Sequence, residues 1–124
     1  MYDELGIFFS IDACCREHDN CPDIIQVNET KHGLINQGLF TRSHCDCDKQ
    51  FYSCLKKDNN LVSKAIGFTY FTVLGLQCFN CDYPIISCIQ KEYIFNGIIA
   101  ERCVSYHKDT RAKKNYQWFD NPVF

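Results

Sequence analysis

A hydrophobic pattern of helical period lies in the middle of the chain, between residues 61 and 76. Apolar residues recur there every three or four positions, a spacing that places them on one face of a helix. A polar break at residues 58–60 precedes this stretch. Before the break we expect another helix, from residue 44 to about residue 57, with Ser43 as its N-cap.

The N-terminal part of the chain predicts one more helix. Asp12 can cap a helix over residues 13–21, and Pro22 should end it, because proline lacks an N–H and crowds the preceding turn. Residues 28–43 contain two glycines and several polar residues, so we expect a loop or a short hairpin there.

Beyond Cys78 the sequence is rich in Tyr and Ile, with turn signals at residues 82–84 and 96–97. This composition predicts a β-hairpin or loops held by cysteines. No repeat and no Gly/Pro-rich linker divides the chain. We therefore expect a single domain over residues 1–124 with a mainly α fold: three helices and a small β-hairpin region.

The cysteine content places the protein in a class. Ten cysteines in 124 residues are typical of a disulfide-rich secreted scaffold, because disulfides persist in oxidising compartments. The formal net charge of −2 gives no basic surface for nucleic acid. No apolar run reaches the roughly 18 residues of a transmembrane segment. Asn28-Glu29-Thr30 is a glycosylation acceptor sequence, which fits secretion but also arises by chance.

Two cysteine pairs share one spacing. Cys14 and Cys21 lie seven residues apart on the first predicted helix, as do Cys47 and Cys54 on the second. Seven residues are about two turns, so each pair forms one stripe. Antiparallel helices would join Cys14 to Cys54 and parallel helices would join it to Cys47. Consecutive helices usually pack antiparallel, so we favour the first pairing, which also joins Cys21 to Cys47.

This clamp has a chemical consequence. His18 lies on the same stripe as Cys14 and Cys21. Asp48 lies about 100° round the second helix from Cys47, and the antiparallel register places it roughly 3 Å along the axis from His18. The spacing therefore predicts a His18–Asp48 hydrogen bond. Asp19 points about 100° away from His18 and could serve a metal.

Residues 12–23, with the pattern C-C-x-x-H-D-x-C, resemble the active-site helix of secreted phospholipases A2. Further segments resemble the group III, or bee-venom, branch of that family. These segments are residues 31–34, 45–48, 51–56 and 116–120. The resemblance covers the chain from about Glu4 to its C-terminus.

The resemblance implies an activity: calcium-dependent hydrolysis of the sn-2 ester of glycerophospholipids at a membrane or micelle surface. His18 would be the general base that activates water, and Asp48 would orient it. Tyr70 aligns with the tyrosine that hydrogen-bonds this aspartate. Asp19 would be a calcium ligand, with the ion acting as a Lewis acid. We expect a monomer.

The resemblance also implies two further bridges, Cys45–Cys78 and Cys88–Cys103, and leaves Cys15 and Cys81 over. The family's Gly-rich calcium loop, whose cysteine would pair with Cys15, is not present in the sequence. A single obvious ligand, Asp19, predicts weak calcium affinity and poor activity of this chain.

The first ten residues also differ from a signal peptide, because Asp3 and Glu4 stand where a basic start and an apolar run are expected. We therefore expect either that the signal peptide has been removed or that the sequence is a fragment or an incomplete gene model.

Two other functions fit parts of the pattern. Cys78-Phe79-Asn80-Cys81 has zinc-like spacing, but a zinc domain would predict a reduced, intracellular protein. A non-catalytic secreted binding protein or toxin on the same scaffold would explain the missing loop. The retained His18, Asp19, Asp48 and Tyr70 favour the enzyme.

Overall fold

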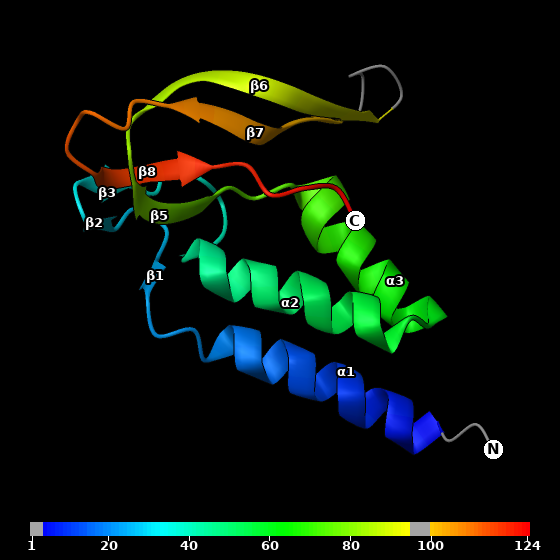
Figure 1. The fold of residues 1–124 in the computed structure, drawn as a ribbon. Helices are drawn as coiled ribbons and strands as arrows, with labels where there is room; N and C mark the ends of the chain where they lie inside the picture. Colours follow the sequence, from blue (N-terminus) through cyan, green and yellow to red (C-terminus); the bar gives the residue numbers. More distant parts are fainter. Residues whose placement is uncertain (1–3, 95–99) are drawn as a thin grey trace.

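The computed structural model describes residues 4–94 and 100–124, and Figure 1 shows helices on one side and strands on the other. The helical segments are α1 (Glu4–Asp19), α2 (Cys45–Asp58), α3 (Leu61–Gly67) and a π-helical continuation η1 (Phe68–Leu74). The strands are β1 (Ile24–Ile25), β2 (Thr30–Lys31), β3 (Leu34–Ile35), β4 (Arg42–Ser43), β5 (Cys78–Asp82), β6 (Ile85–Ile94), β7 (Ala100–Lys108) and β8 (Asn115–Phe119).

The prediction of a mainly α fold is wrong. Helix accounts for 37% of the chain and strand or bridge for 33%, so the fold is mixed α/β. The long β6–β7 hairpin is the main addition, pairing Ile85 with Lys108 at one end and Ile94 with Ala100 at the other. Its strands are exposed at many positions and shift register, so the alternating pattern that identifies a half-buried strand is missing. The predicted turn at residues 96–97 lies outside the described residues.

Two predicted helix starts are also wrong. Helix α1 begins at Glu4, and Asp12 lies inside it, paired with Arg16 one turn later. The N-cap of α2 is His44 rather than Ser43, because the His44 Nδ1 accepts a hydrogen bond from the Asp46 backbone N–H at 3.0 Å. Ser43 instead ends strand β4.

The third predicted helix is present in two parts. Asn60 and Ser63 form a reciprocal capping box at the start of α3. The chain then widens into η1, which ends at Gly75 with a φ of 57°, a left-handed conformation that glycine adopts without strain. Arg102 packs so closely on Gly75 that a side chain at this position would collide with its guanidinium.

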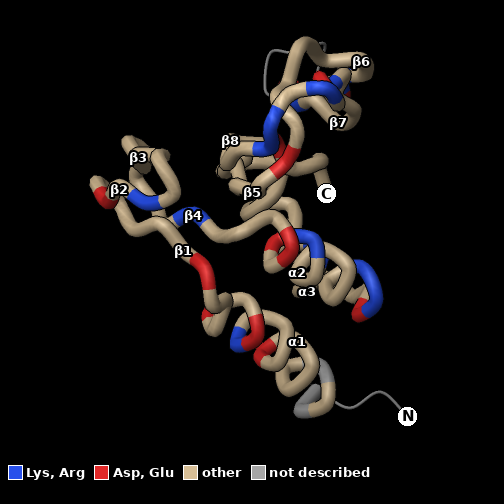
Figure 2. Tube along the Cα trace, turned by 60° about the vertical axis from the view of Figure 1, so that its left-hand side comes forward, with Lys and Arg blue, Asp and Glu red and all other residues tan. Residues whose placement is uncertain are grey.

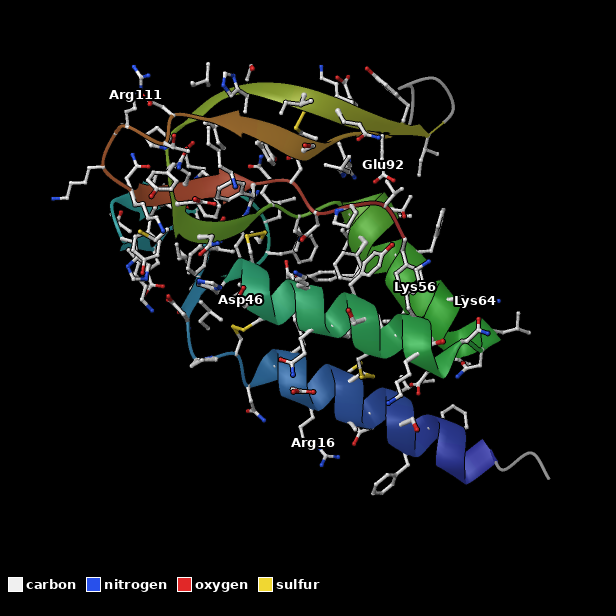
Figure 3. All side chains as sticks on the ribbon, in the orientation of Figure 1. Arg16, Asp46, Lys56, Lys64, Glu92 and Arg111 are labelled. Carbon is white, nitrogen blue, oxygen red and sulfur yellow. A yellow bond between two sulfur atoms is a disulfide. The ribbon has the colours of Figure 1, made fainter. Side chains whose placement is uncertain are left out.

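The predicted clamp between α1 and α2 is confirmed. Disulfides join Cys14 to Cys54 and Cys21 to Cys47, so the two helices run antiparallel, and sulfur atoms lie between their ribbons in Figure 3. Cys14 belongs to the buried core together with Phe51, Leu55 and Phe71.

The bridges that the resemblance implied are also present. Cys45–Cys78 ties α2 to β5, and Cys88–Cys103 crosses the β6–β7 hairpin. Cys15 and Cys81 are free thiols and do not pair with each other.

Three observations bear on the environment in which the protein acts. Within the described residues, no helix is both long and apolar enough to cross a bilayer. Basic and acidic residues are interspersed from α1 to β7 (Figure 2), which matches the net charge of −2. Asn28, the first residue of the glycosylation acceptor sequence, is exposed between β1 and β2.

Candidate active site

The clamped helices bring His18 of α1 against Asp48 of α2. The His18 Nε2 lies 2.7 Å from the Asp48 Oδ1, as the cysteine spacing predicts. Asp48 is fully buried, whereas a small part of the His18 side chain reaches solvent. An ionised carboxylate only accepts hydrogen bonds, so the Nε2 of His18 carries the proton and its Nδ1 keeps a free lone pair.

Asp48 has two further hydrogen-bond donors. The Tyr70 hydroxyl donates to its Oδ1 at 3.0 Å, as the resemblance implies. The Asn121 side chain donates to its Oδ2 at 2.7 Å. All three contacts satisfy a carboxylate that would otherwise be costly to bury. The sequence alone did not identify Asn121, whose one signal is its position just after the family-like segment 116–120.

Aromatic rings fix the orientation of the imidazole. The Phe51 ring stacks on His18 with centroids 4.4 Å apart, and Tyr70 meets it edge-on at 5.1 Å. Burial and then the neighbouring Asp48 raise the pKa of the Tyr70 hydroxyl far above its ordinary value. Tyr70 therefore remains a neutral donor over the whole working pH range.

The exposed edge of His18 opens onto a cleft of about 610 Å³. Most of its lining is apolar, and a second groove of about 370 Å³ shares Phe51, Tyr70 and Leu74 with it. Residues from β1, β4, the loop before β4 and the loop after η1 complete the cleft: Ile24, Phe40, Thr41, Ser43 and Leu76. A base at the wall of an apolar cleft suits a substrate that carries a hydrocarbon chain.

Asp19 contributes a carboxylate to the cleft, but it is exposed. Calcium takes six to eight oxygen ligands. In residues 4–94 and 100–124 there is no cluster of three or more His, Cys, Asp or Glu side chains that could hold an ion. The described residues therefore do not form a calcium site by themselves.

Cys15 also lines the cleft but is a poor nucleophile. Burial and the carboxylates of Asp19 and Asp12 raise the pKa of its thiol, so the thiol stays protonated. The zinc alternative is likewise unsupported, because Cys78 is bridged to Cys45.

Comparisons with known proteins give one family. The sequence profile described as phospholipase A2 matches residues 1–82. A phospholipase A2 of Bombus pensylvanicus is 49% identical over 94% of this chain and 83% of the relative. A phospholipase A2 of Xylocopa appendiculata circumvolans is 44% identical over 95% of this chain, which spans only 62% of that relative. A phospholipase A2 of Apis mellifera is 41% identical over 94% of this chain and 66% of the relative.

Proposed function

Because the chain belongs to the phospholipase A2 family of phospholipid-hydrolysing enzymes, we propose that it cleaves the sn-2 ester of glycerophospholipids. The products would be a fatty acid and a lysophospholipid, formed at a membrane or micelle surface. The observation that carries this proposal is the His18–Asp48 pair at the wall of the apolar cleft.

The proposed reaction begins with a water molecule beside the Nδ1 of His18. His18 removes a proton as the water oxygen attacks the ester carbonyl, and the imidazolium then returns the proton to the leaving glycerol oxygen. Asp48 stabilises the imidazolium and holds the ring, as the aspartate does in a catalytic triad. A positioned general base contributes about 10²- to 10⁴-fold.

Calcium dependence enters the proposal through the family, which is usually calcium-dependent, and through Asp19 as the carboxylate ligand. The described residues supply no complete ligand set, so no step above runs through the ion. We expect hydrolysis by this chain to need high calcium and to fall when a chelator removes it.

The setting is also proposed. Four disulfides support an oxidising compartment and hence a secreted protein. We propose that the chain acts as a monomer. Size-exclusion chromatography with light scattering measures its mass in solution.

A second function is a non-catalytic binding protein on the same scaffold. The exposed, isolated Asp19 favours it, because a scaffold that no longer hydrolyses lipid needs no ion site. Under that function the purified chain would bind lipid or a receptor but release no fatty acid at any calcium concentration.

The deciding experiment uses vesicles of phosphatidylcholine labelled in the sn-2 chain, with sn-1-labelled vesicles in parallel. The wild-type chain should release the sn-2 label, and His18→Gln should lower the rate about 10²- to 10⁴-fold. His107→Gln is the matched control, since His107 is exposed on β7, away from the cleft. Equal rates for His18→Gln and wild type would refute the proposal, and no release by either would favour the binding protein.

A further inference from the structure

Asp48 forms a hydrogen bond with a residue that lies far from it in the sequence, Asn121. The Asn121 Nδ2 donates to the Asp48 Oδ2 at 2.7 Å across a separation of 73 residues. We propose that Asn121 is a positioning residue that holds Asp48, and through it His18, in the state that hydrolysis requires. This inference rests on the proposed role of His18 and extends it to the C-terminal segment.

The hydrogen bonds define the orientation of the Asn121 amide. Its Nδ2 donates to the Asp48 Oδ2 and, at 3.1 Å, to the backbone oxygen of Leu76. Both partners are acceptors, so the NH₂ end of the amide must face them. A flipped amide would place its own oxygen against a carboxylate and a carbonyl. Asn121 therefore supplies donors without adding a charge.

The two oxygens of Asp48 thus have separate tasks. The Oδ1 accepts from His18 and Tyr70, and the Oδ2 accepts from Asn121. Asp48 is 0% exposed and Asn121 only 6% exposed. Without Asn121 the Oδ2 would have no donor from the described residues, and an unsatisfied charged acceptor in this position is costly.

A second cavity, the rear cavity, has a volume of about 440 Å³ and is lined by both Asp48 and Asn121 but not by His18. Beside this cavity the Asn121 amide donates directly to the Asp48 Oδ2. A fixed donor keeps the carboxylate in one rotamer.

The C-terminal segment is anchored on both sides of Asn121. The Asp120 backbone N–H donates to the Tyr106 hydroxyl oxygen at 2.8 Å. The Phe124 N–H donates to the Thr72 Oγ1 at 2.9 Å. Figure 1 shows this segment returning from β8 across the top of α2 to end beside the third helix. Asn121 is thus held against Asp48 by contacts that do not themselves involve the site.

Loss of the Asn121 donor should change the orientation of the pair rather than lipid binding. Without a donor to its Oδ2, the Asp48 carboxylate can leave the rotamer that accepts from the His18 Nε2. The His18 tautomer with its proton on Nε2 and a free lone pair on Nδ1 should then lose population.

Replacing Asn121 leaves the other ionisable groups near His18 and Asp48 unchanged. Tyr70 contacts Asp48 from η1, and Asp19 and Cys15 share the cleft with His18. The charged groups around the rear cavity, from α2, β5, β7 and the segment after β8, are Lys49, Asp82, Lys108 and Asp120.

The test compares Asn121→Leu, Asn121→Asp and the control Asn36→Leu by kcat, KM and ¹⁵N NMR of the His18 imidazole. Asn36 is a suitable control because it is 1% exposed and its Nδ2 also donates twice, but to the backbone oxygens of Ile25 and Phe40. Asn121→Leu should lower kcat about tenfold, with little change in KM, and weaken the NMR signature of the Nε2-protonated His18 tautomer. Asn36→Leu should lower the melting temperature but leave kcat and the His18 tautomer unchanged.

Asn121→Asp keeps the shape of the side chain and puts a second carboxylate beside the first. It should lower kcat at least as far as Asn121→Leu, and it gives the readout if Asn121→Leu does not fold. An unchanged kcat and His18 tautomer in the folded Asn121 variants, or an equal change in Asn36→Leu, would overturn the inference. Retained activity in His18→Gln would instead overturn the proposed function, so the two failures are distinct.

Discussion

His18 and Asp19 are neighbours in α1, yet they lie in opposite environments. His18 is stacked on Phe51 and hydrogen-bonded to the buried Asp48. Asp19 is exposed, and no hydrogen bond or ion pair of its side chain occurs among the described residues. One step along a helix turns a side chain by about 100°, which is enough to separate a preassembled pair from an open carboxylate.

The difference divides the proposed site into two parts that the described residues support to different degrees. The disulfides at Cys14, inside α1, and at Cys21, two residues beyond its end, flank His18 and fasten its helix to the helix of Asp48. Among the described residues, no comparable set of contacts holds the Asp19 side chain in place. We therefore distinguish a proposed base half (His18, Asp48, Tyr70 and Asn121) from a proposed metal half (Asp19).

The strongest test of the base half is Asp48→Asn. The amide cannot reproduce a carboxylate that accepts from His18, Tyr70 and Asn121 together, so we expect kcat to fall at least about a hundredfold. Asp46→Asn is the matched control, because Asp46 lies in the same helical turn (Figure 3) with a side chain 86% exposed. A loss of similar size in Asp46→Asn would show that α2 as a whole, and not the base half, is sensitive.

Removal of the clamp should give the next largest effect. Replacing Cys14 and Cys54 by Ala should lower the free energy of unfolding by about 2–5 kcal/mol, with the loss of activity tracking the loss of folded protein. The comparison pair is Cys88 and Cys103, which close a span of 15 residues rather than 40 and lie in the β6–β7 hairpin. Denaturant unfolding measures both, and a larger loss of activity in the hairpin variant would contradict the role given to the clamp.

Asp19→Asn tests the metal half alone. We expect the calcium concentration at half-maximal rate to rise by roughly tenfold or more, since ligand charge sets calcium affinity. The His18 tautomer seen by ¹⁵N NMR should stay unchanged, because His18 and Asp48 keep their contact. Asp12→Asn, an exposed change on the same helix, should alter neither quantity. A changed His18 tautomer in Asp19→Asn would show that the two halves are not separate.

Tyr70→Phe should give the smallest change. Loss of one neutral donor to Asp48 should lower kcat roughly two- to tenfold. Burial and Asp48 raise the pKa of Tyr70 above the ordinary value of 10.0. Above about pH 10 the unfolded chain therefore releases a proton that the folded chain keeps, and stability falls as pH rises.

The Tyr70→Phe variant should lose part of that alkaline destabilisation. Urea midpoints between about pH 9 and pH 11 measure it. Tyr93→Phe, at a position 57% exposed, serves as the control. An equal alkaline loss of stability in Tyr70→Phe and wild type would contradict the burial argument.

The cysteine spacing predicted more of this molecule than the hydrophobic pattern did. Two seven-residue intervals were enough to predict the antiparallel clamp and the His18–Asp48 contact, because helical geometry is regular. The β6–β7 hairpin was underestimated, since strands exposed on both faces leave no alternating pattern. Asn121 could not be predicted, because its contact depends on how the C-terminal segment returns across α2.

¹⁵N NMR of the His18 imidazole in calcium-free protein tests most directly whether the base half is preassembled. We predict a proton on Nε2 and a free lone pair on Nδ1, unchanged in Asp19→Asn and lost in Asp48→Asn. A proton on Nδ1, or an Nε2 tautomer that forms only after calcium is added, would contradict the claim that the base half is preassembled.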